Sequence, residues 1–259
     1  MNMLRMLSFT VAAAVVCAAS LSSAKADETI KIGVDAAYKP FAFVEANGEL
    51  AGFEIDLIKA VCAEIKANCE LSNVPWDGIF TALETGTIDM IGTTVTKTKI
   101  RLKKYDTSRL IYRVGFAFLV PKDADTSKGL DGLKGQSIGT IVGTQSYYDY
   151  IKGVLGAETD IKGYDTADAA VLDLDAGRIA AFQSDNLQLE QQYVGTGNYK
   201  LAAEATFDPK YVGEGRAWFF RKGSTDLVSK IDKGLDAVIA AGNVGQLGTK
   251  YFHTKLVTN

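Results

Sequence analysis

The stretch IDMIGTTVTKTKIR, residues 88–101, joins a short apolar strand to a polar segment of closely spaced threonines that ends in an arginine. The guanidinium of Arg101 offers a planar fork of N–H donors that matches a carboxylate. The hydroxyls of Thr93, Thr94 and Thr96 can donate or accept hydrogen bonds. Such groups bind the charged ends of an amino acid, although the pattern also describes a strand followed by a solvated polar turn. The remaining sequence favours the first interpretation.

Strand and helix patterns alternate on the N-terminal side of this stretch. Period-two alternation and helical spacing of apolar residues mark the elements, and Asn47-Gly48 is a strong hairpin signal. The patterns predict strands at 29–35, 70–74 and 88–91, a hairpin around residues 47–48, and helices beginning near 56 and over 76–83. Alternating strands and helices favour a parallel sheet with helices on its faces.

The same alternation begins again after residue 114. It predicts strands at 114–120, 137–142, 161–164, 179–183 and 213–220, and helices from about 146, over 167–175, after 185, over 227–241 and near 251–252. The chain is therefore expected to form two α/β lobes joined by a constrained hinge. We place lobe 1 at about residues 27–114 and 207–259, and lobe 2 at about 115–206.

Residues 1–26 have the features of a cleaved export signal. The basic Arg5 precedes an apolar run over 6–19, and Ala24-Lys25-Ala26 has the small-x-small pattern of a cleavage site. Cys17 lies inside the apolar run without the small residues expected before a lipidated cysteine, so we interpret it as part of the signal.

Cleavage after Ala26 would remove Arg5 and Lys25 and leave 233 of the 259 residues, with 26 basic and 31 acidic side chains. A net charge of −5 without basic runs disfavours binding to nucleic acid or to an anionic membrane surface. The length allows one large or two small domains with a proper core.

Two cysteines of the mature chain, Cys62 and Cys69, lie seven residues apart near a predicted helix end. In an oxidising compartment this spacing favours a stabilising disulfide. A metal site is disfavoured because the chain has one histidine, His253, far away in sequence. The same scarcity of histidine disfavours a Ser-His-Asp or Cys-His catalyst. We expect no metal and no cofactor.

Ligands of open α/β sheets bind at the carboxyl ends of strands, so the residues just after each predicted strand are the candidates. They are Asp35, Tyr38, Trp76, Thr93, Thr94, Thr96, Arg101, Gly143, Thr144, Ser146 and Asp185. One cation, two anions, several hydroxyls and two aromatic rings complement an amino acid with its side chain. Each member alone also fits a structural role, as an N-cap, a turn or a core aromatic residue.

Six motifs in a fixed order resemble one family. They are DxxYxPF at 35–41, GELAGFEIDL at 48–57, PWDGIFTAL at 75–83, GTIDMIGTTVTKTKIR at 86–101, LKGQSIGTIVGTQS at 133–146 and DAGRIAAFQSD at 175–185. The order resembles the polar amino-acid binding proteins of bacterial ABC importers, the periplasmic solute-binding family 3, over essentially the whole mature chain. The cysteine pair resembles the disulfide of the lysine/arginine/ornithine and histidine members.

This resemblance implies a type II, Venus-flytrap fold with a hinge and a central cleft. It implies that Arg101 and the Gly143–Thr144 turn hold the ligand carboxylate, and that Asp185 and the region of Thr94 hold the amino group. Asp35, Tyr38 and Trp76 would face the ligand side chain. The chain departs from the family at Ala180-Ala181, where Asp-Ala is common, and at Gln145-Ser146, where Thr-Thr or Thr-Gln is common.

The resemblance also implies a monomer that closes around its ligand in the periplasm and delivers it to an inner-membrane ABC permease without chemistry. Asp35 beside two aromatic rings favours a basic L-amino acid, namely arginine, lysine, ornithine, histidine or a derivative such as an opine. Glutamine is the next choice.

Two other classes remain as alternatives. One is a periplasmic cyclohexadienyl dehydratase on the same scaffold, whose dicarboxylate substrate Asp35 and Asp185 would repel. The other is a receptor sensor domain, which the lack of a transmembrane helix before Asn259 disfavours.

Overall fold

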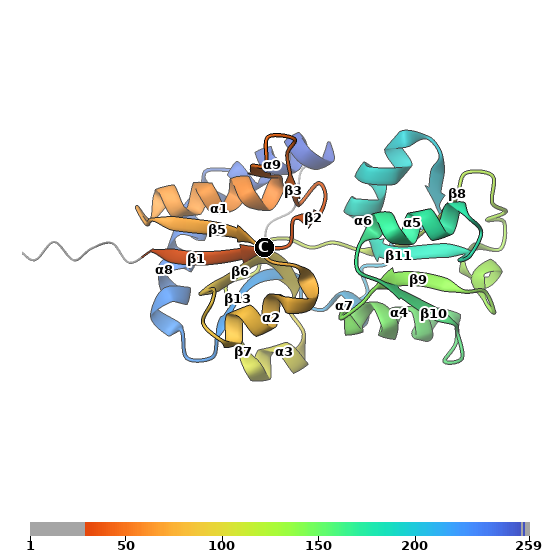
Figure 1. The fold of residues 1–259 in the computed structure, drawn as a ribbon, viewed down its shortest axis with the longest axis horizontal. Coiled ribbons are helices and arrows are strands. Elements are labelled where there is room, and N and C mark those ends of the chain that lie inside the picture. The colour runs from red at the N-terminus through yellow and green to blue at the C-terminus, as the bar shows by residue number, and fades with distance from the viewer. Residues whose placement is uncertain (1–28, 255, 257–259) are drawn as a thin grey trace, which may run out of the picture.

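The computed structural model describes residues 29–254 and 256. The predicted export signal at 1–26 lies outside these residues. Figure 1 shows two α/β lobes side by side, each built around its own five-stranded sheet. The two-lobed α/β architecture predicted from the sequence is confirmed.

The first sheet has the strand order β5-β1-β6-β13-β7. Its strands are β1 (Ile30–Val34), β5 (Cys69–Asn73), β6 (Met90–Thr96), β7 (Tyr105–Thr107) and β13 (Arg216–Arg221). Strand β1 runs parallel to β5 and β6, whereas β13 runs antiparallel to both β6 and β7. The sheet is therefore mixed and not purely parallel, because the chain returns from the second lobe and inserts β13 in the opposite direction.

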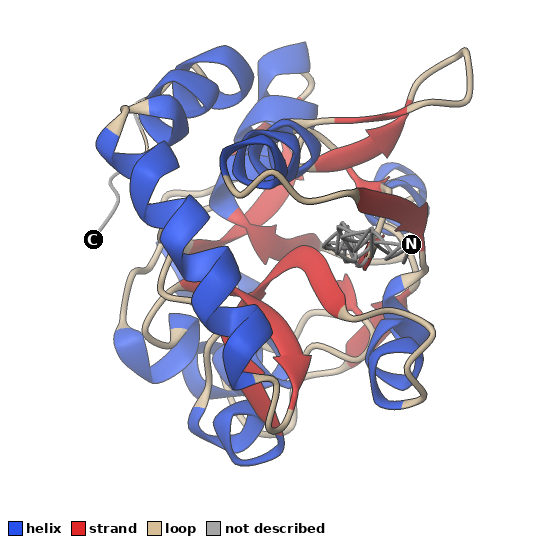
Figure 2. Cartoon of the chain, turned by 90° about the vertical axis from the view of Figure 1, so that its left-hand side faces the viewer, coloured by secondary structure: helices blue, strands red, loops and turns tan. Residues whose placement is uncertain are grey.

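Helices cover both faces of this sheet (Figure 2). They are α1 (Phe53–Glu64), α2 (Trp76–Glu84), α3 (Lys99–Lys104), α8 (Thr225–Ala240) and α9 (Asn243–Phe252). One face packs its apolar residues against α1, α8 and α9, and the other packs against α2. The predicted hairpin is also present, since β2 (Ala37–Tyr38), β3 (Ala42–Val44) and β4 (Leu50–Ala51) form a small antiparallel sheet.

The second sheet has the order β10-β9-β11-β8-β12. Its strands are β8 (Phe116–Pro121), β9 (Ile138–Ile141), β10 (Ile161–Tyr164), β11 (Ala181–Asp185) and β12 (Tyr199–Leu201). Helix α4 (Gln145–Leu155) packs on one face and α5 (Ala167–Asp175) on the other. The chain also contains short helical segments, namely η1 (Gly129–Leu133), α6 (Asn186–Gln188), η2 (Leu189–Tyr193), η3 (Val194–Thr196) and α7 (Pro209–Val212).

Two segments connect the lobes and lie next to each other. The backbone of Phe116 exchanges two hydrogen bonds with Thr206, at 3.0 and 2.9 Å, and the N–H of Gly115 donates to Asn186 Oδ1. The outgoing and returning chains are thus tied together where they cross. The lobe boundaries near residues 114 and 207 stay a prediction.

Strand β6 is longer than its sequence pattern indicated. It continues through Thr96, and all seven of its residues are buried. Threonine is β-branched and favours extended backbone, and the antiparallel pairing of Thr96 with Arg216 extends the strand. The strand end predicted at Ile91 is therefore wrong, and the threonines lie within the strand. Arg101 lies beyond it on helix α3, which the sequence pattern did not predict.

The predicted disulfide is present, with Cys62 at the end of α1 joined to Cys69 at the start of β5. Replacing both cysteines by serine should lower the free energy of unfolding by about 2 kcal/mol, because a short loop is no longer closed in the unfolded chain. Urea unfolding would measure the loss, and reduced wild-type protein should match the double variant. Ligand preference should not change. Titratable thiols in unreduced protein purified from the periplasm would contradict this prediction.

Candidate ligand-binding site

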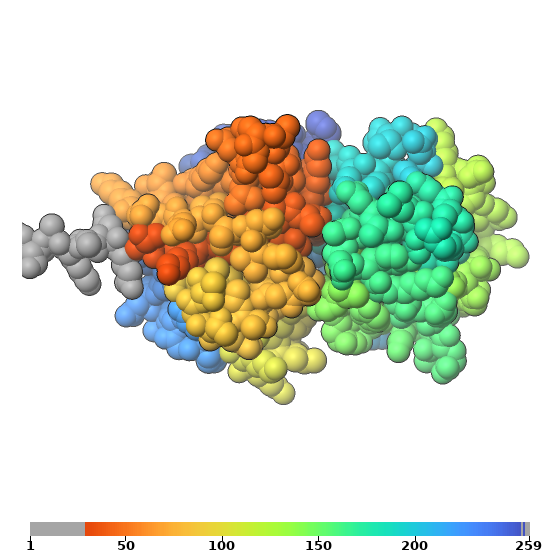
Figure 3. Space-filling view, in the orientation of Figure 1, coloured from red at the N-terminus to blue at the C-terminus, as the bar shows by residue number. Residues whose placement is uncertain are grey.

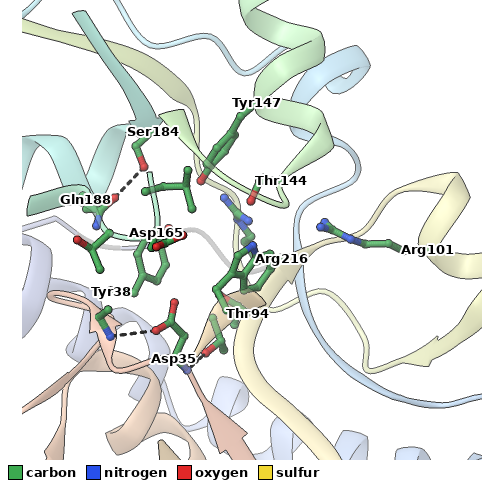
Figure 4. A pocket seen from close by; sticks show the side chains of 16 residues that line it. Asp35, Tyr38, Thr94, Arg101, Thr144, Tyr147, Asp165, Ser184, Gln188 and Arg216 are labelled. Carbon is green, nitrogen blue, oxygen red and sulfur yellow. Dashed lines mark hydrogen bonds between the residues drawn. The ribbon is translucent and has the colours of Figure 1, made fainter. Parts of the chain in front are cut away.

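The two lobes meet face to face (Figure 3), and a cleft between them is lined by polar residues from both lobes (Figure 4). Its lining residues are Asp35, Ala37, Tyr38, Trp76, Thr93, Thr94, Arg101, Ile141, Thr144, Tyr147, Asp165, Thr166, Ala167, Ser184, Gln188 and Arg216. The carboxyl ends of β1, β6, β9, β10 and β11 meet here, as expected for an open α/β sheet. The amino end of the antiparallel β13 reaches the same edge.

An ion pair between Arg216 and Asp185 crosses this cleft. Arg216 begins β13 in the first sheet and is 7% exposed, while Asp185 ends β11 in the second sheet and is 0% exposed. The guanidinium donates to Asp185 Oδ1 through Nη2 and to Thr96 Oγ1 through Nη1 at 2.7 Å. The hydroxyl of Tyr38, also from the first lobe, donates to Asp185 Oδ2. Both oxygens of Asp185 are thus bound by groups of the opposite lobe.

Burial and the charge of Asp185 act in opposite directions on the pKa of Arg216 but in the same direction on the pKa of Tyr38. Burial by itself would lower the pKa of Arg216, but the carboxylate of Asp185 holds that pKa above its ordinary value. Burial, followed by the charge of Asp185, raises the pKa of Tyr38 well above its usual range. Arg216 is therefore cationic and Tyr38 neutral, as their hydrogen bonds require.

Arg101 lies to one side of the cleft, whereas Arg216 is nearer its middle (Figure 4). The Nη1 atom of Arg101 donates to the backbone oxygen of Thr96 at 3.1 Å. Its guanidinium lies 5.9 Å from the ring centroid of Trp76 and 5.4 Å from that of Phe80. Burial, followed by the charge of Arg216, lowers the pKa of Arg101 to about 10. The guanidinium therefore lies beside two aromatic rings, close to a second cation.

Thr94 lines the cleft and is bound from behind by the buried Glu54. Glu54 Oε1 accepts the N–H of Thr94 at 2.7 Å and its hydroxyl at 2.5 Å, and the hydroxyl of Tyr112 lies 3.4 Å from the same oxygen. Among the described residues, no hydrogen-bond partner reaches Glu54 Oε2. Burial raises the pKa of Glu54 to about 7.

The raised pKa of Glu54 predicts how stability depends on pH. Since the folded protein keeps this proton up to about pH 7 and the unfolded chain loses it near the ordinary value of 4.5, Glu54 makes the free energy of unfolding fall as pH rises between these values. Urea unfolding of Glu54→Gln at several pH values should show a flatter dependence than wild type. The exposed Glu158→Gln is the control and should keep the wild-type slope. An identical slope in Glu54→Gln would contradict the prediction.

Asp35 follows β1 and faces the cleft. Its N–H donates to Thr93 Oγ1 at 2.6 Å, and its Oδ1 accepts the N–H of Ala37 at 3.1 Å. Burial raises the pKa of its carboxyl. One oxygen therefore supports the local turn while the carboxyl group lines the cleft beside Tyr38 and Trp76.

The turn before α4 approaches the first lobe from the other side. Gly143 has φ +73°, and a Cβ added there would lie 3.4 Å from Trp76 Nε1, so this turn meets Trp76 across the cleft. Thr144 is buried and lines the cleft. Ser146 is buried too, but it lines a neighbouring groove that also includes Arg101. No hydrogen-bond partner among the described residues reaches its Oγ.

Seven of the predicted site residues line the cleft, namely Asp35, Tyr38, Trp76, Thr93, Thr94, Arg101 and Thr144. Four others border it indirectly: Thr96 and Asp185 through the buried ion pair, Gly143 through Trp76, and Ser146 through the neighbouring groove. The roles of all eleven as ligand contacts stay predictions.

The sequence interpretation missed several lining residues, of which Arg216 is the most important. The strand-end rule covers only residues at the carboxyl ends of strands. Arg216 is the first residue of β13, which runs antiparallel to β6, so its amino end reaches the cleft. An arginine at the start of the apolar run over 213–220 was a usable signal, since a cation in a buried strand needs a partner. Asp165 and Thr166 directly follow β10, so the strand-end rule itself should have included them. Tyr147 and Gln188 lie within helices, where that rule does not apply.

Two features are absent from the described residues. Within 29–254 and 256, no helix is long and apolar enough to span a membrane. In the same residues, no three His, Cys, Asp or Glu side chains are grouped so that they could hold a metal ion.

Known proteins resemble this chain in sequence over most of its length. The family model of bacterial extracellular solute-binding proteins, family 3, matches residues 30–254. The L-arginine-binding protein of Pseudomonas aeruginosa is 31% identical over 236 residues, 90% of this chain and 91% of that protein. The histidine-binding periplasmic protein of Salmonella typhimurium is also 31% identical, over 238 residues that cover 90% of this chain and 91% of that protein.

Solved structures are similar as well. An ancestral arginine-binding protein bound to glutamine has a TM-score of 0.75 and 32% identity, covering 86% of this chain and 97% of its own. An ancestral amino acid-binding protein, described as a precursor of cyclohexadienyl dehydratase, has a TM-score of 0.75 and 29% identity, covering 86% of this chain and 95% of its own.

Two α/β lobes, two crossing segments and a polar cleft between the lobes define a periplasmic-type binding protein of the type II fold. The chain belongs to the bacterial extracellular solute-binding proteins, family 3. The family resemblance found in the sequence motifs is thus confirmed.

Proposed function

We propose that this protein binds a basic L-amino acid in the cleft between its lobes and delivers it to an inner-membrane ABC permease. The main support is the distribution of charge along the cleft. Asp35 and Asp165 also line an adjoining groove that contains Asp77. The groove beside Arg101 contains three lysines, Lys97, Lys99 and Lys210, against two acids, Asp149 and Glu214. A ligand with a carboxylate at one end and a cation at the other complements both sides.

The names of the relatives agree with this choice, since they refer to arginine and histidine. The site residues would act as the sequence suggested, with Arg101 and the Gly143–Thr144 turn at the ligand carboxylate. Asp185 and the region of Thr94 would hold its amino group. Asp35, Tyr38 and Trp76 would contact the side chain. Closure of the lobes would join these contacts, because neither lobe holds all of them.

We further propose that the protein acts as a monomer in the periplasm after removal of residues 1–26. Mass spectrometry of the exported protein should then find a mature chain that begins at Asp27.

A thermal-shift screen followed by calorimetric titration tests the ligand class directly, because a ligand that binds only the folded protein raises its melting temperature. The screen should include arginine, lysine, ornithine, histidine, an opine, glutamine and glutamate. A basic amino acid should give the largest shift. If glutamine or glutamate binds more tightly than every basic amino acid, the proposed ligand class is wrong.

One further activity deserves a test, since an amino acid-binding precursor of cyclohexadienyl dehydratase is 29% identical to this chain. A dehydratase needs a general acid, and burial raises the pKa of Asp35 in the cleft. We favour binding without chemistry because the acidic side of the cleft disfavours a dicarboxylate substrate. Turnover of a cyclohexadienyl dicarboxylate by the purified protein would reverse this choice.

Asp35→Asn should weaken the basic ligand by about 1–3 kcal/mol, as expected for a charged hydrogen bond. Asparagine keeps the oxygen that accepts the N–H of Ala37, so the local turn should persist. Calorimetry with arginine and glutamine would separate the effects, since only the cationic ligand should lose affinity. The exposed Asp77→Asn, in the adjoining groove, is the matched control for a change of charge. Equal loss for both ligands would assign Asp35 a structural role.

A further inference from the structure

The Arg216–Asp185 ion pair occupies the position at which the proposed function places the ligand head group. Asp185 is the expected partner of the ligand α-ammonium, yet its Oδ1 accepts from Arg216 and its Oδ2 accepts from Tyr38. Both residues of the pair are at least 93% buried. Because Asp185 is fully buried behind these donors, a ligand ammonium reaches it only if Arg216 or Tyr38 moves away.

Removing one partner from a buried ion pair is costly, because the other is left as an uncompensated charge. An α-amino acid avoids this cost, since it carries both charges. Its ammonium can take the place of the guanidinium at Asp185, and its carboxylate can take the place of Asp185 at Arg216. After this exchange each buried ion again has a partner of opposite charge.

Thr96 holds two guanidinium groups on the same side of the cleft. Its hydroxyl accepts from Arg216 at 2.7 Å, and its backbone oxygen accepts from Arg101 at 3.1 Å. Like charges held close together repel each other, and the charge of Arg216 contributes to the lowered pKa of Arg101. A carboxylate between the two arginines would relieve this repulsion and could accept from both forks.

We propose that Arg216 is a second carboxylate-binding arginine of this site, and that the Arg216–Asp185 ion pair is exchanged for the charged head group of an α-amino acid. This inference rests on the proposed function and makes it more specific. The ligand must carry an α-carboxylate and a protonated α-nitrogen on the same carbon. Amines without the carboxylate and N-acylated amino acids leave one buried ion unpaired and are rejected.

The test compares L-arginine with agmatine, the same molecule without its carboxylate, by calorimetric titration. Wild type should prefer arginine over agmatine. In Arg216→Met, the affinity for arginine should fall about 10- to 100-fold, while that for agmatine should stay the same or rise. The ratio of the two dissociation constants should therefore shrink by at least about tenfold. A purely structural role would weaken both ligands equally.

Two further variants keep the result interpretable. Arg216→Lys retains the charge without the planar fork and should shift the ratio in the same direction, which covers the case in which Arg216→Met fails to fold. Arg221→Met is the matched control, since Arg221 lies at the other end of β13 and pairs with Asp89. It should leave the ratio at the wild-type value.

The outcomes separate the two proposals. If wild type binds arginine but the ratio is unchanged in both Arg216 variants, or if Arg216→Met binds arginine more tightly, the role of Arg216 is wrong and the proposed function stands. If wild type binds no amino acid in the screen, both proposals are wrong.

Discussion

Asp185→Ala is expected to abolish measurable binding of the amino acid, with a dissociation constant raised by at least about 100-fold. The variant removes the expected partner of the ligand ammonium, which would then be buried in the closed cleft as an uncompensated charge. Breaking a buried pair on one side typically costs about 3–5 kcal/mol. Calorimetric titration with the ligand found in the screen measures the loss.

The same variant should change the protein without ligand. Asp185 binds Arg216 and Tyr38 of the opposite lobe, so its removal deletes two contacts that hold the lobes together. Small-angle scattering should then report a larger radius of gyration than for wild type. Asp173→Ala is the matched control, because Asp173 pairs with Arg178 within the second lobe and away from the cleft. Wild-type affinity in Asp185→Ala would show that Asp185 only links the lobes.

Arg101→Lys should weaken ligand binding by about 10- to 100-fold, the range of a charged hydrogen bond, although the charge is retained. An ammonium cannot reproduce the planar fork that binds a carboxylate while one nitrogen still donates to Thr96 O. Lysine would also lose the contact of the guanidinium with the rings of Trp76 and Phe80. The melting temperature without ligand should change little, because α3 has no fully buried residue.

Arg178→Lys serves as the control for Arg101→Lys, since Arg178 is more than half exposed and forms its ion pair within lobe 2. It should bind ligand like wild type. If Arg101→Lys does so too, Arg101 is a surface residue and Arg216 carries the carboxylate contact alone.

The sequence predicted the architecture well because both lobes follow local rules. The alternation of Thr29 to Asp35 marks β1, and the helical spacing from Leu57 marks α1, so single segments reveal their own structure. The same rules placed Asp35 and Thr94 at the cleft, since each lies at the carboxyl end of a strand. The disulfide also followed from spacing and compartment.

The long-range side-chain contacts at the cleft could not be predicted from local sequence patterns. The partner of Asp185 lies 31 residues later in another lobe, and the carboxyl group behind Thr94 comes from Glu54, 40 residues earlier. Such pairings depend on how the sheets are oriented, and the direction of β13 is set by the path of the whole chain. An alternating pattern reports which face of a strand is buried but not which way the strand runs.

The insertion of β13 between β6 and β7 also determines the order in which the two lobes can fold. The second sheet is formed from one continuous segment, Phe116 to Leu201, whereas the first needs a strand that ends at Arg221. Residues 29–115 therefore keep an unpaired edge on β6 until the chain that follows lobe 2 returns. Long-range pairing of this kind is slow, so lobe 2 should become protected from proteolysis first and lobe 1 last.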